Sequence, residues 1–247
     1  MRNAFEDAAR YLCRARRAVA LTGAGISVES GIPPFRGPGG LWEKIDPMLY
    51  AHIDALEQNP GKVWQVLFKE LKQVIDRAAP NAGHRALFQL EQMGTLYAVI
   101  TQNIDGLHQK AGNRQVVEFH GSFAVQRCMA CGRRCSASDL KLATLPPRCG
   151  CGGVLRPDVV MFGEIIPVEC LQRAQTLAAG CDVMLVIGTS ATVEPAAYLP
   201  AIAKRNGAFL IEINPEKTPL SRISDATLLG PAGEMMGRLT RAVEKSR

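Results

Sequence analysis

The chain has 247 residues, 47% hydrophobic and 21% charged, which excludes a disordered protein and allows one large α/β domain with a smaller insert. No apolar run approaches the roughly 20 residues of a membrane helix, and Glu6 and Asp7 stand where a signal peptide would have its apolar core. These two observations predict no membrane partner and a cytoplasmic location. The formal net charge of +6 comes from scattered Lys and Arg, so we expect no direct nucleic-acid partner.

The predicted elements alternate along the chain between short apolar strands and longer helices. The predicted strands are 18–22, 96–101, 116–119, 183–187 and 209–213. The predicted helices are 4–16, a helix between its cap Asn81 and Gly94, 194–206, and a closing helix with apolar positions Met235, Met236, Leu239 and Val243. This alternation indicates an α/β fold with a Rossmann-like, doubly wound parallel sheet.

A polar motif follows each predicted strand directly. In chain order these motifs are Gly23-Ala-Gly-Ile-Ser27, Gln102-Asn-Ile-Asp105, His120-Gly-Ser122, Gly188-Thr-Ser190 and Asn214-Pro-Glu216. The carboxyl ends of parallel strands lie at one edge of the sheet, and open α/β sheets bind their ligands there. We therefore expect the five motifs to meet in one crevice.

Two segments interrupt the alternation, and together they predict a smaller domain. Residues 33–80 are helix-rich after a start dense in proline and glycine, and residues 125–156 hold most of the cysteines. The larger, discontinuous domain then consists of residues 1–32, 81–124 and 157–247.

The glycine loop after the first strand lets backbone amides approach a phosphate closely, although a tight turn alone would also require glycine. It departs from the dehydrogenase fingerprint, because Val28 stands at the third glycine position. The acidic residue expected about 20 residues later on a second strand is also missing, since Trp42-Glu-Lys44 is predicted to lie in a loop. The loop favours a dinucleotide site but not hydride transfer.

Four of the eight cysteines form two close pairs, Cys128-Met-Ala-Cys131 and Cys149-Gly-Cys151, with seventeen residues between the pairs. This spacing is typical of a tetrahedral zinc ribbon. Four thiolates would complete the coordination of the metal, so the zinc would be structural. The second pair is one residue shorter than usual, which leaves Cys135 as an alternative ligand.

His120 is the histidine at the end of a predicted strand, where an imidazole could accept a proton near neutral pH. Its position fits a structural histidine equally well, and that is the interpretation for His52, His84 and His108. Asn103 and Asp105 share the same edge and could bind a ribose hydroxyl, an amide or a water, or could instead cap helices.

Taken together, these motifs resemble the sirtuin (silent information regulator) family of NAD-dependent protein lysine deacylases. The resemblance runs over nearly the whole chain. It is carried in order by Gly23-Ala-Gly-Ile-Ser-Val-Glu-Ser-Gly-Ile-Pro-Pro-Phe-Arg36, Gln102-Asn-Ile-Asp105, His120-Gly121, the cysteine pairs, Phe162-Gly-Glu164, Gly188-Thr-Ser190 and Asn214-Pro215.

The resemblance implies NAD as a consumed co-substrate, one structural zinc, and acyl-lysine proteins or peptides as partners. It implies His120, Asn103 and Asp105 as the catalytic residues. The implied NAD-binding residues are Gly23, Ala24, Gly25, Ser27, Val28, Phe35, Arg36, Gln102, Ile104, Gly188, Thr189, Ser190, Asn214, Pro215 and Ala232. A strand over 160–164 would pair with the peptide, with the implied contacts Val160, Phe162, Gly163, Glu164 and, across from them, Val193.

In the implied reaction the acyl oxygen attacks the ribose carbon that bears nicotinamide, and His120 takes a proton from a ribose hydroxyl. The products are nicotinamide, free lysine and O-acyl-ADP-ribose. The sequence departs from the family pattern in two places. Pro34 replaces a polar residue before Phe35-Arg36, which we expect to modulate the loop that covers NAD. Leu67 and Glu70 stand where relatives that prefer acidic acyl groups carry Tyr and Arg, so we expect neutral acyl groups such as acetyl.

Two other functions fit the same resemblance. One is protein ADP-ribosyl transfer from NAD, which labelled NAD would separate from deacylation because the label would then appear on protein. The other is a non-catalytic reader of acyl-lysine or NAD metabolites. The joint presence of His120, Asn103 and Asp105 argues against the reader.

Overall fold

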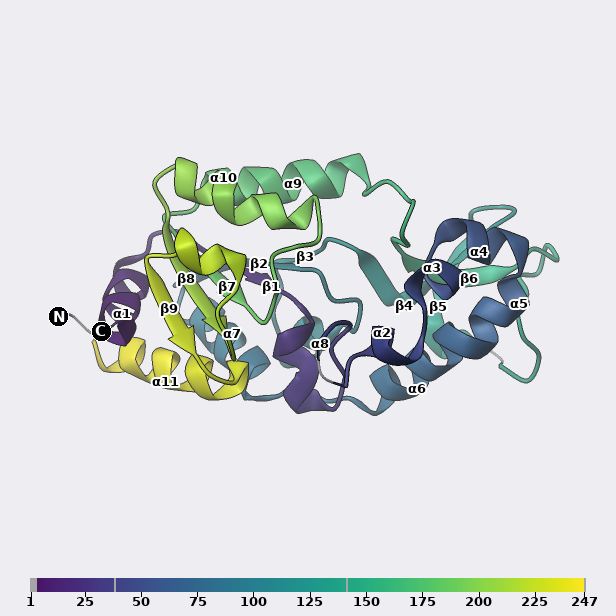
Figure 1. The fold of residues 1–247 in the computed structure, drawn as a ribbon, viewed down its shortest axis with the longest axis horizontal. Helices are drawn as coiled ribbons and strands as arrows, with labels where there is room; N and C mark the ends of the chain where they lie inside the picture. The colour runs from purple at the N-terminus through teal and green to yellow at the C-terminus, as the bar shows by residue number, and fades with distance from the viewer. Residues whose placement is uncertain (1–3, 38, 141, 247) are drawn as a thin grey trace.

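Two unequal lobes lie side by side in the computed structural model, which describes residues 4–37, 39–140 and 142–246. The larger lobe is built around a central parallel sheet, and the smaller lobe combines short helices with a second sheet (Figure 1). Both chain ends lie at the far end of the larger lobe. In the described part of the chain, no helix has the length and apolar character needed to cross a membrane.

The large sheet has six strands in the order β3-β2-β1-β7-β8-β9, and every neighbouring pair is parallel. The central strands consist of apolar residues because helices cover both faces, and β1 and β7 are buried along their whole length. The strands are β1 (Ala18–Thr22), β2 (Leu96–Thr101), β3 (Val116–Glu118), β7 (Val183–Ile187), β8 (Phe209–Asn214) and β9 (Ala226–Leu229). The expected Rossmann-like sheet is confirmed.

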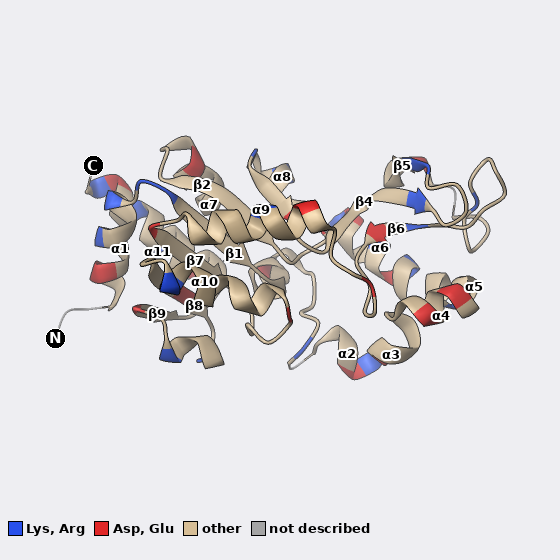
Figure 2. Ribbon diagram, turned by 90° about the horizontal axis from the view of Figure 1, so that it is seen from above, with Lys and Arg blue, Asp and Glu red and all other residues tan. Residues whose placement is uncertain are grey.

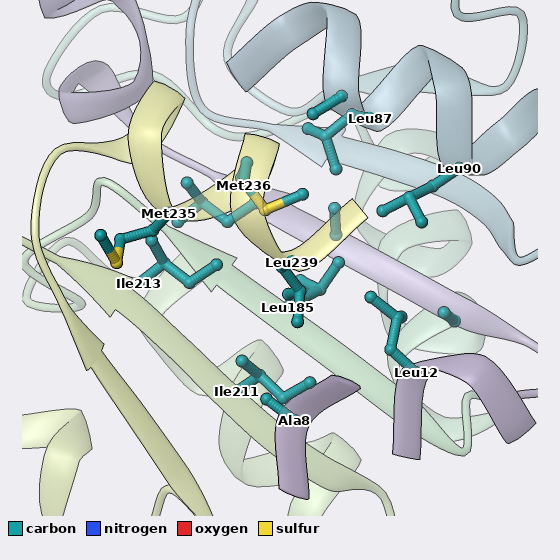
Figure 3. Packing of buried hydrophobic residues seen from close by; sticks show 14 of the residues in the cluster. Ala8, Leu12, Leu87, Leu90, Leu185, Ile211, Ile213, Met235, Met236 and Leu239 are labelled. Atoms are coloured by element: carbon teal, nitrogen blue, oxygen red, sulfur yellow. The ribbon is translucent and has the colours of Figure 1, made fainter. Parts of the chain in front are cut away.

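Two hydrophobic clusters hold helices on the two faces of this sheet. Figure 3 shows one of them, in which helices near both ends of the chain and the helix before β2 cover β7 and β8. The helices of this face are α1 (Ala4–Arg14), α7 (Ala82–Gln92) and α11 (Ala232–Lys245). Those of the other face are α9 (Val168–Ala179) and α10 (Leu199–Arg205), the latter preceded by the 3₁₀ turn η4 (Ala196–Tyr198).

The smaller lobe joins the helical insert to a three-stranded antiparallel sheet in the order β5-β4-β6. Its strands are β4 (Gly121–Cys128), β5 (Arg134–Ser136) and β6 (Leu155–Val159), with the 3₁₀ turn η3 (Ala137–Asp139) after β5. The helices of the insert are α2 (Leu41–Lys44), α3 (Pro47–Tyr50), α4 (Ile53–Gln58), α5 (Pro60–Val63), the π-helical turn η2 (Trp64–Phe68) and α6 (Lys69–Arg77). This sheet runs from Gly121 to Val159, a few residues beyond both ends of the expected segment 125–156.

Several predicted elements differ from the observed ones at their ends. The first helix stops at Arg14 rather than 16, and the helix expected over 194–206 becomes helical only at Ala196, after Pro195. Trp42 lies in the short helix α2 instead of a loop.

Basic and acidic side chains are intermixed over both lobes, with Lys and Arg lying among Asp and Glu (Figure 2).

Candidate functional site

The site begins where the strand order reverses between β1 and β7. The loops after these two strands pack backbone to backbone: the Gly25 amide donates to the Gly188 carbonyl at 2.8 Å. A Cβ at Gly25 would lie 2.6 Å from the Cα of Gly188, and Gly188 itself has a φ of 59°, so both positions require glycine. This reversal point is where open parallel sheets bind dinucleotides.

The glycine loop continues as the 3₁₀ helix η1 (Ala24–Ser30), which contains Ala24, Ser27 and the exposed Val28. The buried Ser27 hydroxyl donates to Asp105 Oδ2 at 2.7 Å, and Asn103 Nδ2 donates to the Gly23 carbonyl at 3.0 Å. Burial raises the pKa of Asp105, whose carboxylate also accepts the amide of Leu107, the first residue of α8 (Leu107–Ala111). The structure thus brings Asn103 and Asp105 against the glycine loop.

His120 stands at the junction of the two sheets, directly before β4. Its Nδ1 lies 3.0 Å from the backbone oxygen of Gln102. A carbonyl oxygen only accepts, so Nδ1 carries the proton of the neutral ring and Nε2 keeps a lone pair. Within the described chain Nε2 makes no hydrogen bond, and burial lowers the pKa of His120, which keeps the imidazole neutral at neutral pH. This is the state that a general base requires.

Gln102 connects the loop after β2 to the loop after β7, because its side-chain amide donates to Thr189 Oγ1 at 3.0 Å. The next residue in that loop, Ser190, is exposed and bonds to Thr192 through its hydroxyl. Ile104 is half-buried and packs against the cluster that fills the smaller lobe. Three of the strand-end motifs therefore lie in mutual contact.

The other histidines have structural surroundings. His84 and His108 are buried, and their ring centroids are 4.9 Å apart. Thr22 donates its hydroxyl to Thr101, so it accepts from Nε2 of His108 at 2.9 Å. His52 accepts the Asp54 amide at the start of α4. These contacts agree with the structural interpretation of all three.

Aromatic rings connect the proline-rich segment to the smaller lobe. Phe35 stacks on Trp42 with centroids 5.3 Å apart, and Trp42 contacts Phe162 at 6.3 Å. The indole nitrogen of Trp42 is buried without a hydrogen-bond partner among the described residues, while Arg36, the residue after Phe35, is exposed. Sequence reasoning did not single out Trp42; its aromatic ring seven residues after Phe35 was the available signal.

The segment 160–164 differs from the strand expected there, because the strand β6 lies earlier and ends at Val159. The backbone of Phe162 bonds instead to the helical insert: its amide donates to Ala51 and its carbonyl accepts from Ile53, both at 2.9 Å. Glu164 explains the early end of the strand, because its carboxylate accepts the Met161 amide at 2.9 Å and closes a turn.

Several polar contacts fix this turn. Gly163 has a φ of 84° and lies directly against the ring of His52. Arg156 and Glu164 form a bidentate pair at 2.8 and 2.7 Å. The Val160 amide donates to the carbonyl of His120 at 2.8 Å, so the segment meets the candidate base through its backbone. Val193 lies half-buried in the loop after β7.

Farther along the same sheet edge, Asn214 ends β8 and is followed by the exposed Pro215, while Ala232 is buried in the first turn of α11. Glu29 of the glycine loop accepts the Gly233 amide at 2.6 Å and so ties that loop to α11. An acidic residue suits a helix N-terminus. Sequence reasoning missed this contact, because the two residues lie 204 positions apart.

The four cysteines of the two pairs form one cluster, with all four Sγ atoms within 4.8 Å of one another. Cys128 and Cys151 are 3.6 Å apart, and Cys131 and Cys149 are 3.9 Å apart. A tetrahedron of thiolates about 2.3 Å from zinc has edges of about 3.8 Å, so the spacing fits a structural zinc. Cys135 is not among the four clustered residues.

Comparison with known proteins gives consistent matches over the whole chain. A family model described as the Sir2 family matches residues 23–195. A curated relative from Pyrobaculum aerophilum, named "NAD-dependent protein deacylase 2", is 48% identical over 240 residues, which cover 97% of this chain and 96% of the relative.

Two solved structures are similar in fold and sequence. One, described as a Sir2 homolog-NAD complex, has a TM-score of 0.91 and 44% identity, and the match covers 98% of this chain and 94% of that chain. The other, described as "Sir2-p53 peptide-NAD+", has a TM-score of 0.86 and 34% identity, covering 98% of each chain.

Proposed function

The chain belongs to the Sir2 family and is an NAD-dependent protein deacylase, and we propose that it removes acetyl and other neutral acyl groups from lysine. The observation that carries the proposal is the neutral imidazole of His120, whose lone-pair nitrogen lies at the same sheet edge as the glycine loop. Acyl-lysine proteins and peptides are the expected partners. The cytoplasmic location expected from the sequence stays a prediction.

The residues around the strand reversal fit NAD. Gly25 and Gly188 bring the loops after β1 and β7 together without side chains of their own, and Asn103 and Asp105 present polar groups beside the first loop. Asn214, Ser190 and Ala232 lie along the outer half of the same edge, which suits the adenosine half. This arrangement supports a division into a larger NAD-binding part and a smaller part made of 33–80 and 125–156.

When bound, NAD supplies a ribose carbon from which the positively charged nicotinamide ring departs readily. His120 accepts a proton from a ribose hydroxyl through Nε2, while the carbonyl of Gln102 holds the ring by Nδ1. Asn103 and Asp105 orient the sugar and the amide, and Ser27 keeps the Asp105 carboxylate in place. Phe35, Trp42 and Phe162 exclude water from the reacting atoms.

Nicotinamide release tests this function. We expect wild-type protein to release nicotinamide only when an acetyl-lysine peptide is present, and His120→Ala to reduce that rate by roughly two or more orders of magnitude, the effect of losing a general base. The variant should still bind ADP-ribose, because the imidazole is replaced without touching the glycine loop. Release that does not depend on peptide would contradict deacylation, and labelled NAD that marks the protein would favour ADP-ribosyl transfer instead.

Acyl selectivity follows from the surroundings of Leu67. This side chain is buried in an apolar cluster that reaches Ile104 and Phe162, whereas Glu70 is exposed and negatively charged. Neither Leu67 nor Glu70 offers a cation to an acidic acyl group.

We expect faster removal of acetyl than of succinyl from the same lysine peptide. The comparison requires kcat/KM for both acyl groups on one sequence, at saturating NAD. A higher value for the succinyl peptide would refute the assignment of neutral acyl groups.

A further inference from the structure

Glu212 is a buried carboxylate in the middle of β8 that the reaction described above does not use. Its side chain is 1% exposed, and the strand residues on either side, Ile211 and Ile213, are fully buried. No Lys or Arg of the described chain forms an ion pair with it; the carboxylate instead accepts hydrogen bonds from three hydroxyl groups. The donors are Thr218, Ser221 at 2.5 Å and Thr227 at 3.2 Å.

A buried carboxylate is costly unless its oxygens are satisfied, so its three partners indicate what it holds. Two donors, Thr218 and Ser221, belong to the segment 215–225 that connects β8 to β9, and they lie at the 3₁₀ turn η5 (Pro219–Arg222). The third donor, Thr227, lies opposite Glu212 in β9. The carboxylate thus fastens the connecting segment onto the strand that precedes it.

The segment held in this way starts at Asn214, at the carboxyl end of β8. The side-chain amide of Asn214 donates to the backbone carbonyl of Glu216 at 3.1 Å. The backbone carbonyl of Asn214 accepts the amide of Gly230 at 3.0 Å. Thr218 and Ser221 also bond to each other, through the Thr218 amide. The carboxylate is therefore linked to Asn214 through Thr218 and the backbone of residues 216–218, within one loop.

We propose that Glu212 is a positioning residue that sets the shape of segment 214–218 and thereby the affinity for the adenosine half of NAD. The proposal rests on the proposed function, in which Asn214 lies against that half. Glu212 lies inside the sheet and acts through Thr218 and Ser221. It should therefore affect the binding of the dinucleotide and leave the chemical step unchanged.

Glu212→Gln tests the proposal, because glutamine keeps the size of the side chain but replaces one acceptor oxygen with a donor. We expect the KM for NAD and the Kd for ADP-ribose to rise by about tenfold, the effect of about one lost hydrogen bond. The kcat at saturating NAD and the KM for the acyl-lysine peptide should stay within about twofold, since uniform binding alone is lost. Ser221→Ala, which removes one donor and leaves the carboxylate, should produce a smaller rise in the same KM.

Thr227→Val is the matched control. It removes a donor to the same carboxylate from β9 but none from the connecting segment, so it should lower thermal stability without raising the KM for NAD. A rise with Thr227→Val as large as with Glu212→Gln would overturn the proposal, because the carboxylate would then only stabilise the sheet. A fall in kcat without a change in KM would overturn it as well.

Calorimetric binding of ADP-ribose separates this inference from the proposed function. Wild-type protein that binds ADP-ribose but does not deacylate would contradict the function and leave the positioning role supported by weaker binding in Glu212→Gln. Deacylation by wild type together with equal ADP-ribose binding by wild type, Glu212→Gln and Ser221→Ala would overturn the positioning role alone.

Discussion

At the scale of single residues, burial gives the histidines of this chain different tasks. Burial lowers the pKa of His84 to about 4 and that of His108 to about 3. The positive charge of Arg85 lowers the pKa of His84 further, and the neighbouring His84 does the same for His108. Both rings therefore stay neutral in the folded protein well below the ordinary histidine pKa. Their hydrogen bonds to the capping residue Asn81 and to Thr22 link them to the structure rather than to a ligand.

These two low pKa values predict an acid-sensitive fold. The unfolded chain binds protons on both histidines below about pH 6.5, whereas the folded chain does not until about pH 4 to 3. The contribution of the two neutral rings to the free energy of unfolding is thus complete above pH 6.5. As the pH falls toward 4, the free energy of unfolding decreases by about 1.4 kcal/mol per pH unit for each histidine.

His108→Gln should reduce this slope, because glutamine can still donate to Thr22 but does not titrate. The measurement is the free energy of unfolding in urea between pH 7 and pH 4.5. Thr240→Val, an equally buried substitution of a group that does not titrate, should keep the wild-type slope. Equal slopes in wild type and His108→Gln would contradict the prediction.

At the scale of elements, the zinc-bearing sheet is too small to be stable by itself. It has three short strands, and its hydrophobic cluster contains two of the cysteines, Cys128 and Cys149, with Leu155. A structural zinc contributes on the order of 10 kcal/mol to folding, more than such a small core provides. The indole of Trp64 donates to the Leu155 carbonyl at 2.8 Å and attaches the sheet to the helical insert.

We expect one zinc ion per chain. A strong chelator should remove this zinc, and the small sheet should then lose its ordered structure. Cys149→Ser should abolish stoichiometric zinc binding, measured with a colorimetric indicator, and should expose residues 125–156 to proteolysis. Cys135→Ser is the matched control and should retain the metal, because Cys135 is not one of the four cysteines whose Sγ atoms lie together. Loss of zinc from Cys135→Ser would contradict the assignment of ligands.

The same scale explains which elements the sequence could reveal. β7 was recognisable because all five of its residues are apolar and buried. β9 escaped notice because only two of its four residues are buried, and β6 because it contains Arg156, Pro157 and Asp158. The buried charge of Arg156 is balanced by Glu164, a partner that no local pattern announces.

At the scale of the whole molecule, the location of the site could be predicted because a parallel sheet gathers its strand ends at one edge. Contacts between segments far apart in the chain could not be predicted in the same way. Trp42 meets Phe162, and Val160 meets His120, only once two distant segments have folded. Such contacts depend on packing, which leaves no periodic signal in the sequence.

His120 occupies the seam between the lobes, and its backbone and side chain face different neighbours. The carbonyl accepts the amide of Val160, which directly follows β6 of the small sheet, while Nδ1 of the ring donates to the carbonyl of Gln102, which directly follows β2 of the large sheet. The next residue, Gly121, has no room for a Cβ, which would come within 2.2 Å of the Asp158 carbonyl. The orientation of the imidazole therefore depends on both sheets, on one through the backbone of His120 and on the other through its ring.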